Sequence, residues 1–152
     1  MKLMLAMTIA AVFFVAVGSG CSGPLVMLPG GELSGNVKPV PADWSFSDAF
    51  EDVQLETRPG DPYSVNVWGV GVGSQFFIAS GRGMDSAWAR HISEDPRVRV
   101  RIGEDLFELQ AVRSEDAGDR ERFLQAAKRK YDGFEPDEEQ AAEAVLFVLG
   151  PR

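Results

Sequence analysis

Cysteine, histidine and positive charge are all scarce in this sequence. Its 152 residues include one cysteine and one histidine, which excludes an internal disulfide and leaves a zinc site without its usual ligands. The 15 Lys and Arg residues are outnumbered by 23 Asp and Glu residues, giving a formal net charge of −8. Because an acidic surface repels phosphate backbones, we expect no nucleic-acid partner. We expect no metal site because the sequence has only one histidine and one cysteine.

Long hydrophobic runs are absent except at the N-terminus. There, the predominantly apolar segment Leu3–Val17 follows the single charge of Lys2, and small residues lead to Cys21. A run of this length is short for a membrane span and typical of a secretory signal peptide. We therefore expect residues 1–20 to be a signal peptide and residues 21–43, rich in Gly, Pro and Ser, to begin with Cys21 and form a flexible linker.

The residues Gly18-Ser19-Gly20-Cys21 resemble the lipobox of bacterial lipoproteins, although Gly18 stands where Leu, Val or Ile is usual. The resemblance implies that Cys21 becomes the first residue of the mature chain and carries palmitate or similar acyl chains. The protein would then be anchored in the cell envelope, and Ser22 after the cysteine favours the outer membrane, facing the periplasm. The alternative is that Cys21 is a free thiol.

Residues 44–152 have the alternation expected of a small α+β domain. Apolar residues recur at every second position in the segments 52–58, 63–71, 75–80, 97–102 and 106–113, which predicts strands. Helical spacing predicts helices near 86–94, 114–132 and 137–144. Residues 145–149 are compatible with a closing strand or with a continuation of the last helix.

Two features of these strands could suggest an anion site. Gly69, Gly71 and Gly73 alternate with valines, but no helix follows them, so a bent or bulged strand is favoured over a phosphate-binding loop. Arg97, Arg99 and Arg101 form a stripe on one strand face. We expect this stripe to be solvated, with Glu108 and Gln110 as cross-strand partners.

The segment from Tyr63 to Arg152 resembles a small branch, of unknown function, of the split β-barrel flavin- and deazaflavin-binding (nitroreductase-like) superfamily. The features that carry the resemblance are Asn66-Val67-Trp68-Gly69, Gly81-Arg82-Gly83, Trp88-Ala89-Arg90, Asp95-Pro96-Arg97-Val98, Lys130-Tyr131 and Leu149-Gly150-Pro151. The resemblance implies a split β-barrel of about six strands with two or three covering helices, spanning residues 44–152. It also implies a homodimer.

The same resemblance suggests FMN or a deazaflavin as a cofactor, with six candidate residues. Arg82 and Arg90 would hold its phosphate, Trp68 or Trp88 would stack on its ring, and His91 or Tyr131 would lie nearby as a polar group. The chain has Ser80-Gly81-Arg82-Gly83 near the phosphate loop of characterised relatives but lacks their fuller basic motif.

Two functions are compatible with these residues. One is non-catalytic binding of a small ligand or an envelope partner, which is favoured because the sequence contains no nucleophile–base pair, metal cluster or paired carboxylates; no catalytic residue is predicted. The other is a flavin- or deazaflavin-dependent oxidoreductase that uses the barrel groove.

Overall fold

The structure, a computed structural model, describes residues 28–152, and alternating apolar side chains build its strands. In β5 (Arg97–Ile102), Val98, Val100 and Ile102 are buried, whereas the arginines between them are at least partly exposed. Successive strand residues point to opposite faces, so one face of β5 lines the interior of the molecule and the other faces outward. The predicted strand over 97–102 is confirmed.

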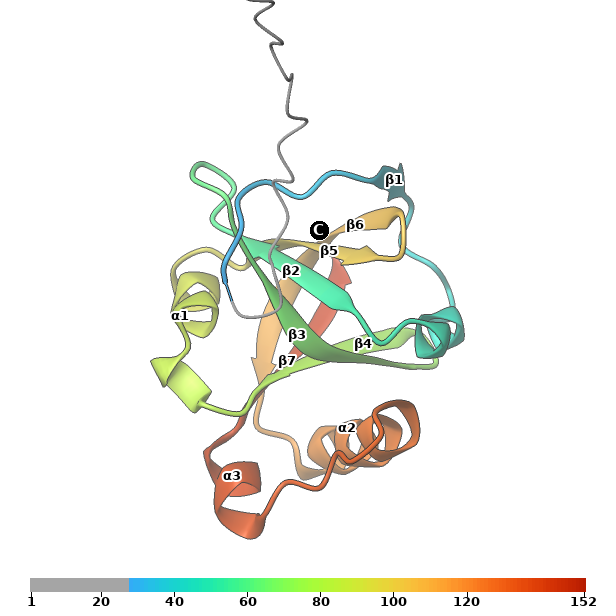
Figure 1. Ribbon diagram of the computed structural model, residues 1–152, viewed down its shortest axis with the longest axis vertical. Helices are drawn as coiled ribbons and strands as arrows, with labels where there is room; N and C mark the ends of the chain where they lie inside the picture. Colours follow the sequence, from blue (N-terminus) through green and yellow to red (C-terminus); the bar gives the residue numbers. More distant parts are fainter. Residues whose placement is uncertain (1–27) are drawn as a thin grey trace, which may run out of the picture.

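Six antiparallel strands close into a barrel, as predicted (Figure 1). They are β2 (Val53–Thr57), β3 (Tyr63–Val72), β4 (Gln75–Ser80), β5, β6 (Asp105–Ser114) and β7 (Val145–Pro151). Their order is β6-β5-β2-β3-β4-β7, and pairing of β6 with β7 completes the circle. Residues 145–149, for which two conformations were compatible, therefore belong to a strand that hydrogen-bonds to both of its neighbours.

Two hydrophobic clusters lie on opposite sides of this sheet. The barrel interior contains side chains from all six strands and from the segment before β2, including Trp44, Leu55, Phe76, Val100, Phe107 and Phe147. The second cluster lies outside the barrel, where Val70 and Phe77 meet Phe123 and Ala127 of α2 (Ala117–Lys130). Strands β3 and β4 are thus buried on both faces where α2 covers them.

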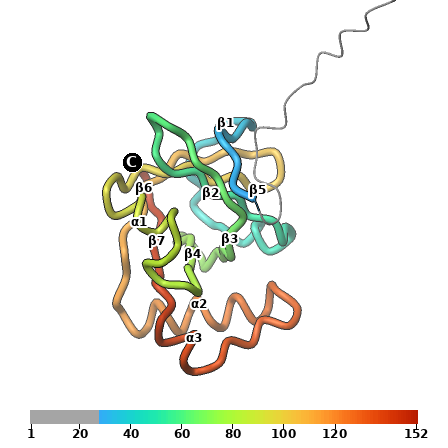
Figure 2. The backbone as a smooth tube through the Cα atoms, turned by 60° about the vertical axis from the view of Figure 1, so that its left-hand side comes forward, coloured from blue at the N-terminus to red at the C-terminus, as the bar shows by residue number. Residues whose placement is uncertain are grey.

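The helices lie around the barrel and shape its outer surface (Figures 1 and 2). Helix α1 (Ala87–Glu94) begins after Ser86 and packs on the barrel through Trp88, Ala89 and Ile92. Helix α2 and the short α3 (Glu138–Glu143) lie together at one end of the molecule. No helix within residues 28–152 is long and apolar enough to cross a bilayer.

The part of the predicted linker that the structure describes, residues 28–43, is packed against the barrel and differs from the expectation of a flexible tether. Leu33 is buried, Gly30 bridges to Ser64, and β1 (Asn36–Lys38) pairs in parallel with the start of β6. These backbone hydrogen bonds and the buried leucine supply contacts that composition alone did not indicate. The predicted signal peptide and the predicted lipidation site, Cys21, lie outside the described residues.

The expectation of a solvated arginine stripe is wrong at its central residue. Arg99 donates from Nε and Nη2 to the buried carboxylate of Glu56, both at 2.7 Å, and also to the carbonyl oxygen of Leu33 at 3.1 Å. Its side chain is therefore largely covered. Glu108, the expected partner, lies opposite Arg99 in the β5–β6 register but pairs with Arg152 instead.

Candidate functional site

Trp68 is the most prominent exposed aromatic side chain on the outer face of the barrel. It lies in β3 next to Gly69, and 48% of its surface is exposed. Trp68 packs edge to face with Phe134, with ring centroids 4.8 Å apart. A cavity and a groove both border Trp68.

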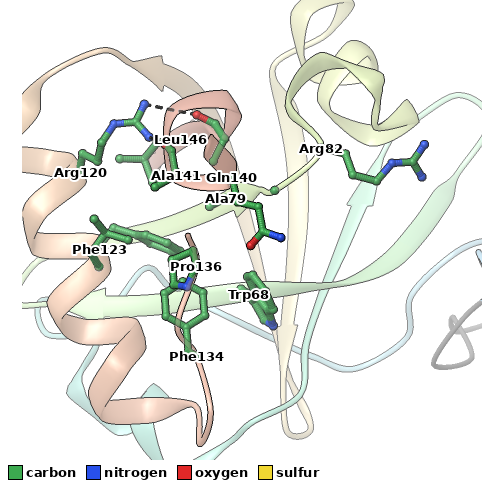
Figure 3. A pocket seen from close by; sticks show the side chains of 13 residues that line it. Trp68, Ala79, Arg82, Arg120, Phe123, Phe134, Pro136, Gln140, Ala141 and Leu146 are labelled. Carbon is green, nitrogen blue, oxygen red and sulfur yellow. Dashed lines mark hydrogen bonds between the residues drawn. The ribbon is translucent and has the colours of Figure 1, made fainter. Parts of the chain in front are cut away.

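The cavity has a volume of about 270 Å³ and is lined mainly by apolar side chains (Figure 3). Its walls come from β3, β4, α2, α3, the segment before α3 and the start of β7, and include Trp68, Phe123, Leu124, Phe134, Pro136, Ala141 and Leu146. Arg120 of α2 donates to the carbonyl oxygens of Ala141 at 2.7 Å and Ala144 at 3.3 Å. These bonds hold the end of α3 over the cavity, because carbonyls at a helix C-terminus lack partners within the helix.

The groove brings together four of the six candidate residues, namely Trp68, Arg82, Trp88 and Tyr131. Its volume is about 520 Å³, and Glu51, Asp52 and Asn66 also line it. Trp88 is only 7% exposed, and its ring packs on Phe147 of the barrel core, with centroids 5.7 Å apart. Trp88 therefore forms the floor of the groove and has little free ring surface on which a ligand could stack.

Arg90 and His91 line neither the cavity nor the groove. Arg90 donates to the carbonyl oxygens of Met84 and Asp85, at 2.9 and 2.8 Å, and so fixes the turn before α1. His91 Nδ1 lies 3.0 Å from the hydroxyl of Thr57. Burial, with help from the nearby charge of Arg58, lowers the pKa of His91.

Tyr131 completes the edge of β3. Strand β2 pairs with β3 only as far as Val67, so the amide and carbonyl of Gly69 on that side have no strand partner. The Tyr131 hydroxyl accepts from Gly69 N at 3.0 Å and donates to Gly69 O at 2.9 Å. Lys130 Nζ donates to the same oxygen at 2.8 Å.

The same burial changes how these two side chains ionise. It raises the pKa of Tyr131 to about 12 and lowers the pKa of Lys130 to about 8. Because its hydroxyl is committed to Gly69 and hard to deprotonate, Tyr131 is suited to a structural role rather than to acid–base chemistry.

Phosphate binding fits this groove poorly. Of the two arginines expected to hold a phosphate, Arg90 is engaged by carbonyls outside the groove, and only Arg82 lines it. Glu51 and Asp52 line the same groove and would repel an anion. The residues present do not match a phosphate-bearing flavin or deazaflavin, which needs charge-assisted hydrogen bonds from several donors.

Sequence reasoning did not identify the cavity itself. Phe123, Phe134, Gln140 and the acidic residues near Trp68 were not among the candidate residues predicted from the sequence. Phe134 follows Gly133, whose φ of 72° turns the chain back after α2. The sequence signal that could have identified Phe134 is an aromatic residue directly after the glycine that ends the helix. No group of three or more His, Cys, Asp or Glu residues between 28 and 152 could hold a metal ion.

Comparison with solved structures shows the same fold at low sequence identity. A candidate pyridoxamine 5′-phosphate oxidase from Listeria innocua aligns with a TM-score of 0.54 and 18% identity, covering 70% of this chain and 87% of the other. A conserved hypothetical protein from Mycobacterium tuberculosis gives 0.57 and 20%, with coverage of 70% and 76%. An F420-H2 dependent reductase gives 0.53 and 18%, with coverage of 66% and 94%.

Sequence comparison places the chain in a family. No curated protein matches it. Residues 46–145 match the model of a family described as uncharacterized proteins conserved in bacteria (DUF2255). This match covers more than half of the chain, from the segment before β2 to the start of β7. The protein is therefore a split-barrel member of the DUF2255 family, similar in fold to the candidate pyridoxamine 5′-phosphate oxidase and to the F420-H2 dependent reductase.

Proposed function

We propose that this protein is a lipid-anchored component of the bacterial envelope whose split barrel binds a small aromatic ligand without catalysing a reaction on it. The observation that carries the binding function is the apolar cavity of about 270 Å³ beside Trp68. Its size is close to the lower end of ordinary small-molecule pockets, and its lining of aromatic and aliphatic side chains is typical of them.

The geometry favours binding over catalysis. Two ionisable side chains line the cavity: Arg120 is engaged by carbonyl oxygens of the α3 end, and Arg82 is directed away from Trp68 and Phe123 (Figure 3). Tyr131 and Lys130, close by, are engaged by Gly69. Catalysis of acid–base or nucleophilic type needs a free group of suitable pKa at the reacting atom. Within residues 28–152 the cavity wall offers aromatic contact area and the Gln140 amide at its mouth.

The binding function is tested by filling the cavity. Ala141 lines it, whereas the neighbouring Ala142 is exposed and does not. A neutral fluorescent probe, N-phenyl-1-naphthylamine, should bind the protein, and Ala141→Leu should weaken binding at least tenfold because the added methyl and methylene groups occupy the space. Ala142→Leu is the matched control and should bind as the unmodified protein does. Equal binding by both variants would contradict the assignment to this cavity.

The envelope location rests on the leader and on Cys21. Several acyl chains on one residue would anchor the domain stably, because a single chain binds membranes only marginally. Cells given labelled palmitate should incorporate it into the protein, and Cys21→Ser should abolish the label and release the protein from the membrane fraction. Label that persists in the variant would overturn the lipidation proposal.

The second candidate is a flavin- or deazaflavin-dependent oxidoreductase, which is supported by fold likeness to the F420-H2 dependent reductase. The poor match of the groove to a phosphate weighs against it. An absorbance spectrum of the purified protein separates the two functions. We expect a colourless protein that does not bind added FMN; a yellow protein that loses its colour in Arg82→Ala would favour the oxidoreductase.

A further inference from the structure

We propose that the ligand is an aromatic cation, whose flat apolar ring system occupies the cavity and whose positively charged nitrogen lies outside the cavity, on the sides of Trp68 where carboxylates gather. This inference rests on the proposed binding function and concerns the charge of the molecule bound. It follows from the distribution of charged groups around Trp68 and from the exposed ring of Trp68 itself.

Carboxylates surround Trp68 on two sides. Glu51 and Asp52, which precede β2, line the groove that Trp68 borders. Asp132 and Glu135, from the turn after α2, line an adjoining depression of about 380 Å³ that Trp68 and Phe134 also border. All four side chains belong to exposed residues, so their charges face solvent at the mouth of the site.

Two cations, Arg82 and Arg120, line the cavity and no carboxylate within residues 28–152 does, so the positive charge of a ligand would lie outside the cavity walls, beside the carboxylates of the groove and of the adjoining depression. Arg120 is held by the carbonyl oxygens of Ala141 and Ala144, and Lys130 by that of Gly69. Arg82 lines the cavity and the groove, and its side chain has no ion-pair partner within residues 28–152. Figure 3 shows the Arg82 side chain directed away from Trp68 and Phe123.

This arrangement favours a cation for two physical reasons. The carboxylates at the mouth lower the energy of a positive charge and raise that of a negative one, and the effect weakens as salt screens it. The face of an indole ring also attracts a cation within about 6 Å of its centroid. Trp68 packs edge to face with Phe134 and remains nearly half exposed, so part of its ring is available to contact a ligand.

Three probes with the same naphthalene ring test the charge preference: 2-naphthylmethylammonium, 2-naphthylmethanol and 2-naphthoate. Each is titrated against the full-length protein in a non-ionic detergent by isothermal calorimetry, with Trp68→Ala as the blank for partition into micelles. We expect the ammonium probe to bind about tenfold more tightly than the carboxylate at low salt, equivalent to ~1.4 kcal/mol. The difference should shrink at high salt.

The triple variant Glu51→Gln, Asp132→Asn, Glu135→Gln identifies the source of the preference. It should remove most of the difference between the ammonium and carboxylate probes and leave binding of the neutral alcohol unchanged. Glu104→Gln is the control, because Glu104 is exposed in the β5–β6 turn and does not line the cavity, the groove or the adjoining depression.

The outcomes separate this inference from the function on which it rests. If all three probes bind equally, or the carboxylate binds most tightly, the cation inference is overturned and the binding function stands. If the triple variant keeps the full preference for the ammonium probe, the carboxylates are not its source and the inference fails. If no probe binds beyond the Trp68→Ala blank, the binding function itself is overturned, and this inference with it.

Discussion

At the scale of single residues, Lys130 and Tyr131 show how one buried strand edge changes the chemistry of adjacent side chains. Both side chains donate hydrogen bonds to the carbonyl oxygen of Gly69 in β3. Gly69 lies beyond Val67, the last residue of β3 that pairs with β2. Burial disfavours the charged form of each group, so the pKa of Lys130 falls to about 8 while that of Tyr131 rises to about 12. Lys130-Tyr131, one of the motifs that carry the family resemblance, thus supplies hydrogen bonds to the part of β3 that β2 does not pair with.

The lowered pKa of Lys130 makes stability depend on pH. Between pH 8 and about 10.4, the usual lysine pKa, the unfolded chain holds a proton on this lysine that the folded protein has released. Stability rises with pH wherever the unfolded state binds more protons, so this lysine makes the free energy of unfolding increase across that window. Lys130→Met should remove this contribution, as measured by urea denaturation at pH 7.5 and pH 9.5. An unchanged pH dependence in the variant would contradict the lowered pKa of Lys130.

The hydroxyl of Tyr131 makes a stability contribution of its own. Tyr131→Phe keeps the ring but leaves the buried Gly69 amide without an acceptor, and an unsatisfied buried group costs about 1–3 kcal/mol. We expect a loss of unfolding free energy in this range by chemical denaturation. Tyr63→Phe is the control, because no side-chain hydrogen bond involves the Tyr63 hydroxyl within the described residues. A loss no larger than in the control would show that water replaces the tyrosine.

At the scale of elements, the glycines of β3 are explained by packing rather than by ligand binding. A Cβ at Gly71 would lie 2.5 Å from Cβ and 2.5 Å from the carbonyl oxygen of Trp44, closer than non-bonded atoms approach. Gly73 adopts a φ of 58° in the turn to β4. The sequence favoured a strand over a phosphate-binding loop at these glycines, and Gly69 and Gly71 do lie in strand β3. Position 71 requires glycine because the backbone of Trp44 approaches it closely.

Gly71→Ala should therefore destabilise the barrel by about 1–3 kcal/mol, the usual cost of overpacking a core. Gly150→Ala is the matched control: Gly150 also lies in a strand, and a Cβ there would meet nothing within 4 Å. We expect the control to change the unfolding free energy by no more than about 0.5 kcal/mol. Thermal and urea denaturation of both variants measure the difference, and equal stability would show that the Trp44 segment moves away at little cost.

At the scale of the whole molecule, the Glu56–Arg99 pair connects the barrel to the N-terminal segment of residues 28–43. Glu56 is 3% exposed and also accepts from the backbone N–H of Leu33 at 2.5 Å. Arg99 donates to the Leu33 carbonyl and to Glu32. This network holds residues before the barrel against β2 and β5, so the order of that segment depends on side chains far away in sequence.

Glu56→Gln should loosen the N-terminal segment and destabilise the protein. The variant replaces the charge-assisted hydrogen bonds of Arg99 and of the Leu33 amide by bonds to a neutral amide, and leaves the exposed Glu32 as the only carboxylate beside Arg99 among the described residues. Loss of a hydrogen bond to a charged group costs about 1.5–3 kcal/mol. Amides of residues 30–38 should then exchange with deuterium faster than those of β5. Glu108→Gln is the control, because Glu108 pairs at an exposed position with Arg152, where an ion pair contributes about 1 kcal/mol or less. Unchanged exchange in Glu56→Gln would mean that β1 and Leu33 hold the segment by themselves.

Much of the fold could be predicted from the sequence because local patterns carry the information. Alternation in segments such as Arg97–Ile102 specifies which side chains face the core, and Gly103 with a φ of 60° marks the turn that follows. Helix α1 begins after Ser86, as helical spacing near 86–94 predicts, although the Ser86 hydroxyl makes no capping hydrogen bond and lies 2.6 Å from the Ser80 hydroxyl. In the candidate site, Trp68, Arg82, Trp88 and Tyr131 were identified from resemblance and lie together.

What the sequence by itself determined was five of the six barrel strands, the three α-helices, their buried faces and the acidic balance of charge, whereas it did not decide between strand and helix at residues 145–149. Only the tertiary structure decided that Arg99 is buried against Glu56, that residues 28–43 join the barrel, and that Phe123, Phe134 and Trp68 enclose a cavity. The physical reason is distance along the chain. Strand and helix patterns arise between near neighbours, whereas an ion pair or a cavity wall needs residues from separate elements, which local periodicity cannot bring together.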